Sequence, residues 1–589
     1  MPQEISPGTP SGDADIIFFG GSIVTVTDED SVPEAVAVKD GLIVFVGSQA
    51  RAEAEWQGPD TQWRDLRGGV LLPGFIDAHG HVIGTGLQAT IANLLADPDG
   101  DVTSIESLQE KLREFARSEV GQRSEWILGF GYDDSTLAEG RHPTRDDLDA
   151  VSTDKPVLAI HQSFHLGAVN STGLELLDYT TETKDPEGGV IRRRTLARGT
   201  ASEPPYGDPD GVLEETAFTP ASNLAIAGMS VTDSGQFLAK GLLSAASFGF
   251  TTVQEGAASL DVLNLMREIA DAYPDGLATD VVVYVLAAEA MKAPDQLRAS
   301  RTYTKGLRAA GVKLVLDGSP QGRTAWLTEP YTTVPEGREE NYRGYQTLTD
   351  EAALAQVRAG FAHGWHVIAH VNGDAAIDQL IRSVRTVTDE AGPADRRTTA
   401  IHCQTARRDQ IKAFGELDII PSFFSMHTYY WGDWYYDTVL GPARAVDISP
   451  ARWAVGRGMA YTSHHDAPVA LPNSIAILSS QVTRVTRSSG RILGRAQRVS
   501  ALDAVKSITI NAARQYYEED TKGSIEVGKL ADLVILSHNP LKIAPEDIKD
   551  ITIKETIKQG KTVYPSSPTH PNLLPTLRRA TPVGFIHHC

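Results

Sequence analysis

Between residues 70 and 515, short apolar runs typical of buried strands alternate with patterns typical of amphipathic helices. One helix is predicted after Thr103, which precedes Glu106 with the spacing of a capping box. Its apolar face consists of Ile105, Leu108, Leu112 and Phe115. Another helix is expected from about Asp350 to Gly364, with a strand immediately after it. Helix and strand therefore form a repeating unit, which predicts an α/β fold with a parallel sheet.

Eight apolar runs are candidate parallel strands. They cover residues 70–78, 251–255, 281–287, 312–317, 366–371, 398–403, 418–424 and 459–466. Eight such units predict a (β/α)8 TIM-type barrel, whose chemistry lies at the carboxyl ends of its strands. The segment between the first two runs, residues 94–236, is too long for a plain loop, so we expect an insertion subdomain there.

Both ends of the chain have a different texture, with short β-rich runs broken by glycine turns. Residues 1–69 and 516–564 are therefore expected to share a small β-domain around the barrel segment, residues 70–515. The final residues, 565–589, contain five prolines and are expected to form an extended tail.

Composition narrows the class of protein. The chain has 589 residues, 41% of them hydrophobic, which is typical of a globular protein. Its net charge of -22 disfavours nucleic acid and membrane surfaces as partners. The two cysteines, Cys403 and Cys589, suit a reducing cytoplasm, and we expect neither a signal peptide nor a transmembrane helix.

Histidines and one aspartate lie where predicted strands end. His79 and His81 follow the first strand, and two residues at this spacing in extended backbone project to one face, as ligands of one cation do. His370, His402 and Asp466 end later strands. Each alone suits a core histidine or a loop cap, but together at one end of one barrel they favour a metal site. The spacing of His366 and His370 also suits a helical protease site, which the β-branched residues between them exclude.

Lys313 lies inside the apolar run 312–317, where burial of an ammonium group is costly. Reaction with carbon dioxide would convert it to a carbamate, an anionic ligand able to bridge two metals. A snorkelling or salt-bridged lysine is the alternative.

Several segments in this order resemble the amidohydrolase superfamily, and within it family 3, the YtcJ-like branch. The resemblance rests on LPGFIDAHGH (72–81), HVNGDAAID (370–378), the histidine at 402, the aspartate at 466 and GSIEVGKLADLVIL (523–536). Segments 165–170, 312–325 and 428–444 are similar to this branch as well.

The resemblance implies a metal-dependent barrel hydrolase with a β-sandwich built from both chain ends. By the same resemblance, His79, His81 and Asp466 would hold one metal and His370 and His402 a second, with carboxylated Lys313 as the bridge. One or two divalent ions are implied, with zinc as the first candidate.

A metal of this kind supplies hydroxide at neutral pH and polarises a carbonyl group, and Asp466 would carry the proton to the leaving nitrogen. His165, Arg323 or His427 would steady the oxyanion or the substrate, although each residue type is more often structural. Tyr429, Tyr430, Trp431 and Trp434 are expected either to wall a pocket or to pack against a helix. Cys403 and His402 are neighbours on a strand and point to opposite faces, which disfavours a thiol nucleophile.

The leading hypothesis is hydrolysis of a C–N bond in a small neutral substrate, with an N-substituted formamide first. An ester, carbamate, urea-type compound or cyclic amide would fit the same site, because pocket details decide the substrate. A barrel without catalysis, acting as a scaffold, is the remote alternative. The assembly stays open, with a homodimer as one candidate.

Overall fold

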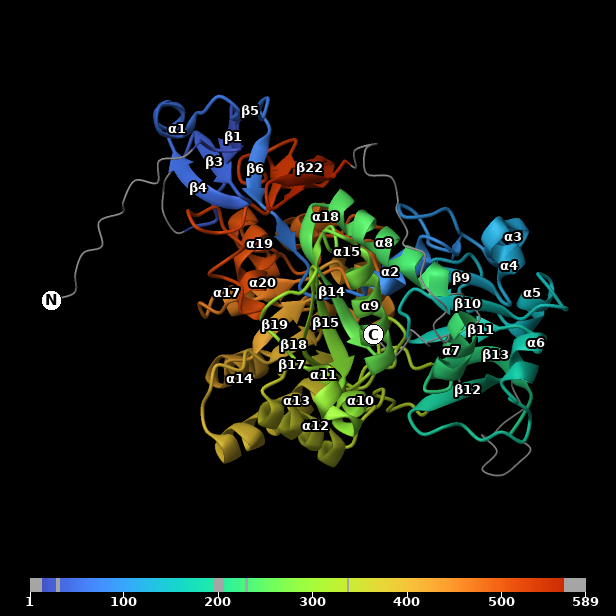
Figure 1. Cartoon of the computed structure of the whole chain (residues 1–589). Helices are drawn as coiled ribbons and strands as arrows, with labels where there is room; N and C mark the ends of the chain where they lie inside the picture. Colours follow the sequence, from blue (N-terminus) through green and yellow to red (C-terminus); the bar gives the residue numbers. More distant parts are fainter. Residues whose placement is uncertain (1–12, 28–31, 195–205, 228–230, 336–337, 566–589) are drawn as a thin grey trace.

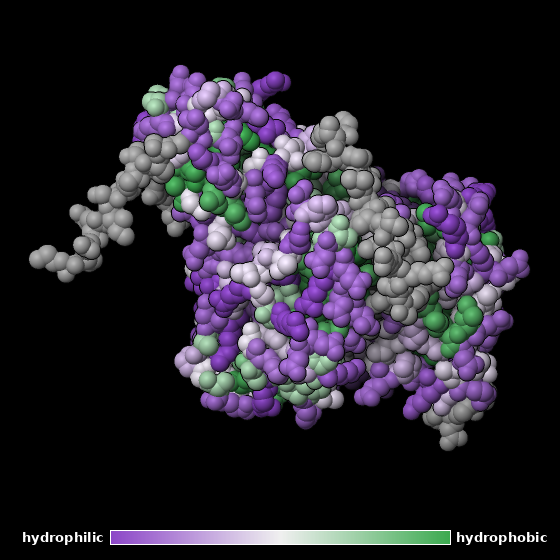
Figure 2. Space-filling model, viewed as in Figure 1, coloured by the Kyte–Doolittle hydropathy of each residue, from purple (hydrophilic) through white to green (hydrophobic). Residues whose placement is uncertain are grey.

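The fold is α/β, with an eight-stranded sheet at its centre. A computed structural model describes residues 13–27, 32–194, 206–227, 231–335 and 338–565 (Figure 1). From residue 566 on, the predicted tail lies outside the described residues. No helix in the described part of the chain is both long and apolar enough to cross a bilayer. Figure 2 shows mainly hydrophilic residues on the visible face, with smaller hydrophobic patches between them.

All neighbouring strands of the central sheet are parallel, and each predicted run supplies one of them, in the predicted order. The strands are β7 (Phe75–Ile76), β14 (Phe250–Ala258), β15 (Asp280–Leu286), β16 (Leu307–Val315), β17 (His366–Val371), β18 (Thr399–His402), β19 (Ile420–Phe423) and β20 (Thr462–Ser463). The first predicted run divides at Gly74, because β6 (Val70–Pro73) pairs in another sheet.

The sheet curls so that its two edges meet at the carboxyl ends of the strands. Within the described residues no ladder joins β20 to β7, but the segments after them are hydrogen-bonded. The N–H of Asp466 donates to the carbonyl of His79 at 3.2 Å, and the N–H of His81 donates to that of Ala467 at 2.7 Å. The end of the last strand is thereby held beside the end of the first.

Helices follow most of these strands. They are α9 (Leu260–Ala272), α10 (Ala287–Lys292), α11 (Pro294–Leu297), α12 (Asp350–His363), α13 (Asp374–Ala391), α14 (Arg408–Leu417), α15 (His427–Trp434), α16 (Gly441–Ala445), α17 (Ala451–Val455), α18 (Ser474–Thr483), α19 (Ala501–Ser507) and α20 (Ile510–Gln515). As predicted, α12 ends at Gly364, which has a positive φ of 66° as its C-cap.

The segment between β7 and β14 has a sheet of its own, in the order β12-β13-β11-β10-β9-β8. Its strands are β8 (Ala92–Asn93), β9 (Ile127–Tyr132), β10 (Val157–His161), β11 (Leu166–Val169), β12 (Gly189–Arg193) and β13 (Pro209–Glu215). Its helices are α2 (Val82–Gln88), α3 (Ile105–Arg117), α4 (Glu119–Arg123), α5 (Arg145–Asp149), α6 (Ser171–Leu176), α7 (Thr219–Ala227) and α8 (Val231–Ser247). Helix α3 is capped by Ser104 and Ser107, so the cap predicted at Thr103 was wrong by one residue.

Strands from both chain ends share a five-stranded sheet in the order β2-β6-β21-β22-β23. They are β2 (Ser22–Ile23), β6, β21 (Leu533–Leu536), β22 (Ile553–Lys558) and β23 (Lys561–Tyr564). A four-stranded sheet next to it contains β1 (Ile16–Phe19), β3 (Ala35–Lys39), β4 (Leu42–Gly47) and β5 (Gln62–Asp65), with α1 (Gln49–Trp56) against it. Both lie beside the central sheet in Figure 1.

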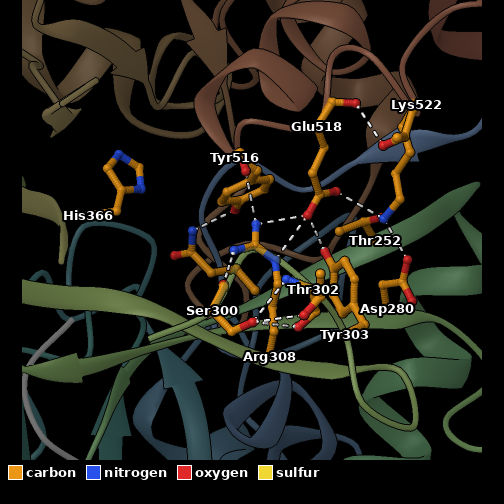
Figure 3. A network of polar contacts seen from close by, with 12 residues as sticks. Thr252, Asp280, Ser300, Thr302, Tyr303, Arg308, His366, Tyr516, Glu518 and Lys522 are labelled. Carbon is orange, nitrogen blue, oxygen red and sulfur yellow. Dashed lines mark hydrogen bonds and ion pairs between the residues drawn. The ribbon is translucent and has the colours of Figure 1, made fainter. Parts of the chain in front are cut away.

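A buried polar network joins the amino ends of the central strands to the segment after α20 (Figure 3). Arg308 of β16 lies 2.8 Å from Glu518, and Lys522 lies 2.5 Å from Asp280 of β15. The hydroxyl of Tyr303 donates to Glu518 at 2.6 Å. Buried charges need partners of this kind, and here each contact also fixes the C-terminal segment to the sheet.

Candidate metal centre and cavity

His79, His81 and Asp466 converge where β7 and β20 end. Their ligand atoms all lie within 4.8 Å of one another, and all three residues are buried. Oδ1 of Asp466 is 3.4 Å from Nε2 of His79 and 3.5 Å from Nε2 of His81, and it makes no hydrogen bond within the described part of the chain. A buried carboxylate oxygen facing two imidazole nitrogens is a typical donor set for a divalent cation.

Hydrogen bonds define which nitrogen of His79 carries its proton. Nδ1 lies 2.5 Å from Oε1 of Gln254, whose amide nitrogen donates to the carbonyl of Ala78 and to the hydroxyl of Tyr516. Because that amide oxygen can only accept, Nδ1 of His79 is the donor and Nε2 keeps its lone pair. Burial lowers the pKa of His79 well below its ordinary value, so the ring is neutral. A neutral imidazole whose Nε2 carries no proton is prepared to bind a metal.

Lys313 of β16 lies beside the same imidazole, with Nζ 2.9 Å from Nε2 of His79. The lysine is 1% exposed. Lys313 is therefore buried within an apolar strand, as predicted, and its amino group points to the candidate metal ligands.

Three further imidazoles form a row. Nε2 of His402 is 3.1 Å from Nδ1 of His370, and its Nδ1 is 3.1 Å from Nε2 of His464. His402 and Asp466 both have positive φ, 72° and 55°, a conformation that costs non-glycine residues energy and is typical of functional sites. At these strand ends it turns the backbone so that both side chains enter the cluster.

A cavity of about 210 Å³ opens at these residues. It is lined by Ser163, His165, Ser319, Gln321, His370, Asn372, His402, Phe424, His427, Asp466 and Val469. Residues of the insertion and of the central sheet thus share its wall.

His165, a predicted catalytic residue, lies in this wall with Nδ1 2.8 Å from Oε2 of Glu215. Burial alone lowers its pKa, but the adjacent carboxylate of Glu215 raises it more, so the net pKa lies above the ordinary value. An imidazole that lines the cavity and whose pKa is raised is suited to stabilise developing negative charge.

Asp317 supports the part of the cavity wall that contains Asn372. Its carboxylate accepts backbone N–H groups of Trp326, Asn372 and Gly373 at 2.7–3.0 Å. Burial raises its pKa to about 7 despite these hydrogen bonds. The carboxylate therefore fixes the loop that follows His370.

The remaining candidates lie elsewhere or have structural contacts. Arg323 is not among the lining residues; its guanidinium lies over the ring of Trp434 at 5.6 Å. His427 does line the cavity and bonds the hydroxyl of Tyr435. Tyr430 and Trp431 bond Asp99 and Asp133, so they pack against the insertion. Cys403 is buried, and burial raises the pKa of its thiol.

A family model described as the amidohydrolase family matches residues 62–564. The chain belongs to the amidohydrolase family. The predicted resemblance is thereby confirmed.

Curated members of similar length share about a quarter of their residues with this amidohydrolase. The putative amidohydrolase YtcJ of Bacillus subtilis is 27% identical, over 94% of this chain and 99% of the relative. The N-substituted formamide deformylase of Arthrobacter pascens is 23% identical, over 93% and 98%. An uncharacterized metal-dependent hydrolase from Pyrococcus horikoshii has a similar fold, with a TM-score of 0.69 at 22% identity, over 90% of this chain and 99% of that structure.

Sequence reasoning assigned no role to several residues that complete this amidohydrolase site. His464 stands in a His-His-Asp run at a strand end, and Gln254 and Glu255 are polar residues in an apolar strand. Glu255 lies 3.6 Å from Nδ1 of His81 and accepts the N–H of Ile83 at 3.0 Å. Polar residues in an otherwise buried strand were the available signal.

Proposed function

We propose that this amidohydrolase cleaves a C–N bond in a small neutral amide-type substrate, with an N-substituted formamide as the first candidate, by metal-dependent hydrolysis. We also propose that its curled sheet is a closed (β/α)8 barrel spanning residues 70–515, with a β-sandwich formed by 1–69 and 516–564. The observation that carries the functional proposal is the convergence of His79, His81 and Asp466 beside a cavity that their neighbours line.

The donor set fits a divalent metal. Nε2 of His79 carries no proton, and Oδ1 of Asp466 lacks a hydrogen bond within the described residues. His79, His81 and Asp466 would hold one ion. His370 and His402 would hold a second, and zinc is the first candidate because it prefers imidazole and carboxylate ligands.

Lys313 supports the two-metal form. It is buried next to neutral imidazoles, an environment that disfavours a positive charge. Addition of carbon dioxide to its amine releases a proton and forms a carbamate, whose two oxygens could bind both ions. The alternative with one metal leaves Lys313 as an amine beside His79.

The chain's own residues divide the remaining work. A divalent metal in this donor set lowers the pKa of water and polarises a carbonyl group. Asp466 would accept a proton from the attacking water and return it to the leaving nitrogen. His165 lines the cavity and would stabilise the oxyanion.

The lining of the cavity supports the proposed substrate class. Its wall combines imidazoles and neutral polar groups with Phe424 and Val469, so it suits a compact polar group with a short apolar substituent. The Arthrobacter relative is named for deformylation of N-substituted formamides. Esters, carbamates, ureas and cyclic amides contain the same polarised carbonyl and form the comparison panel.

The test combines metal analysis with hydrolysis of that panel by the purified protein. We expect at least one bound divalent ion per chain and fastest turnover on a formamide or amide. His79→Ala should lose metal and turnover, whereas His538→Ala, which removes an exposed histidine, should lose neither. An active protein without metal would refute the proposal, and so would wild-type turnover in His79→Ala.

A further inference from the structure

A second group of buried polar residues lies in the insertion, next to the cavity wall. Nε2 of His161 is 3.2 Å from Oδ1 of Asp134, and Nε2 of His142 is 3.7 Å from Oδ2 of the same carboxylate. On its other side His161 meets Ser163, whose hydroxyl oxygen is 2.8 Å from Nδ1. Ser163 lines the cavity. A chain of contacts thus runs from Asp134 through His161 and Ser163 to the place where a substrate would lie.

The backbone defines the proton positions in this chain. The N–H of Ser163 donates to Nδ1 of His161 at 3.0 Å, so Nδ1 has no proton of its own. The ring proton therefore sits on Nε2 and is donated to Asp134. The hydroxyl of Ser163, also facing the unprotonated Nδ1, must donate to it as well.

The remaining capacity of Ser163 is that of an acceptor. Its oxygen takes the N–H of His165 at 3.2 Å, and its hydrogen is committed to His161. A hydroxyl oxygen has two lone pairs, so one is left for a partner in the cavity. That partner must be a hydrogen-bond donor, such as the N–H of a secondary amide.

A cation site is the competing interpretation, since Asp134, His142 and His161 have ligand atoms within 4.8 Å of one another. Two observations disfavour it. A metal at Nε2 of His161 would require the ring proton to move to Nδ1, where the N–H of Ser163 already points. The nearby guanidinium groups of Arg192 and Arg323 also act on His142 and oppose a further positive charge.

We infer that Ser163 is a substrate-binding residue that accepts the N–H of a secondary amide, and that His161 and Asp134 are positioning residues that fix the direction of its hydroxyl. The inference rests on the proposed function and narrows its substrate class to amides that carry an N–H, such as formamides with one substituent on nitrogen. Tertiary amides and esters lack the donor and would leave the Ser163 oxygen without a partner.

The test compares a formamide that has one nitrogen substituent with its N-methylated counterpart. For Ser163→Ala, kcat/KM on the secondary formamide should fall about tenfold, as expected for one hydrogen bond of about 1.4 kcal/mol. The value on the tertiary formamide should stay unchanged. Asp134→Asn and His161→Phe should also lower the ratio of kcat/KM on the secondary formamide to that on the tertiary one. Ser163→Thr, which keeps a hydroxyl, should have the native ratio. Thr172→Ala, which removes an exposed hydroxyl of the insertion, should not change the ratio. An unchanged ratio in Ser163→Ala, or equal losses on both substrates, would overturn the inference.

If no substrate is turned over, the proposed function is refuted but the inference about Ser163 is not. A second measurement then tests that inference separately. Nitrogen-15 spectra of histidine-labelled protein, assigned with His161→Phe, should show a protonated Nε2 and an unprotonated Nδ1 for His161. Competition binding should favour N-methylacetamide over N,N-dimethylacetamide, and Ser163→Ala should remove that preference. A metal-shifted His161 signal, or equal binding of the two amides to the native protein, would overturn it.

Discussion

Replacement of Gln254 by leucine tests how this amidohydrolase prepares His79 for metal. The Gln254 oxygen accepts Nδ1–H of His79 at 2.5 Å, and its amide group is held in turn by Ala78 and Tyr516. The hydroxyl of Tyr516 donates to the carbonyl of Asp77 at 2.7 Å (Figure 3 shows Tyr516 beside the buried network). Gln254→Leu keeps the size of the side chain but removes the oxygen that accepts Nδ1–H of His79.

The expected loss follows from the position of the ring proton. Without an acceptor at Nδ1, the buried imidazole gains by moving its proton to Nε2, which then cannot bind a cation. Removal of such a supporting hydrogen bond typically lowers metal affinity about 10- to 100-fold, or roughly 1.4–2.7 kcal/mol. Turnover at limiting metal should fall by the same factor.

Metal affinity is measured by competition with a chelator of known affinity, followed by metal content and by turnover. Tyr303→Phe is the matched control, because it removes a partly buried hydroxyl that donates to Glu518 in the network of Figure 3 and, among the described residues, makes no hydrogen bond to His79. It should lower stability by about 1–2 kcal/mol and leave metal affinity unchanged. Native affinity in Gln254→Leu, or an equal loss in Tyr303→Phe, would refute the reasoning.

Three further predictions address the site and the fold. Asp466→Asn should abolish turnover while circular dichroism stays native, because the proton acceptor is lost; a wild-type rate would contradict the assigned role. Lys313→Ala should bind one metal or none, with partial rescue of metal content by short carboxylic acids, and unchanged stoichiometry by elemental analysis would count against the bridge. In His366, which accepts from Tyr284 and donates to the carbonyl of Arg397, burial lowers the pKa from the ordinary 6.5 to about 4. The fold therefore favours the neutral ring of His366. The contribution of this ring to the free energy of unfolding is complete above pH 6.5 and is lost as the pH falls from 6.5 towards 4. At pH 5 the loss is about 2 kcal/mol. Urea unfolding at pH 7.5 and pH 5 should show a smaller pH difference for His366→Gln, and an equal difference would exclude this histidine as the cause.

The sequence predicted the strands that carry the chemistry better than it predicted where they begin and end. Runs such as 366–371 are continuous and apolar because both faces of a parallel strand are buried, so their positions could be recognised without a structure. The run 70–78 has the same appearance, but it serves two sheets. The chain passes from one sheet to the other at Gly74, where an added Cβ atom would lie 2.5 Å from the side chain of Thr251. A close approach of this kind depends on a partner far along the chain and leaves no local pattern.

The metal-ligand candidates were predictable for a similar reason. Strand ends meet at one edge of a parallel sheet, so histidines at 79, 81, 370 and 402 were expected together before any coordinates. The groups that orient them were not. Gln254 is 175 residues from His79, and its role depends on which amide atom faces the ring. The contact between His161 and Ser163 is local, but the sequence does not show that a backbone N–H determines which ring nitrogen of His161 carries the proton.

The pairing of β6 with β21 has a consequence for how the protein is made. β6 leads directly into β7 and His79, yet its neighbour in the five-stranded sheet is Leu533–Leu536, which leaves the ribosome more than 450 residues later. Domains generally fold as units during synthesis, so this one stays incomplete until translation is nearly finished. A nascent chain that stalls after residue 466 but before that strand would contain all the candidate metal ligands, in a domain that still lacks β21. A release assay on stalled ribosomes would detect metal uptake only after residue 536 has emerged.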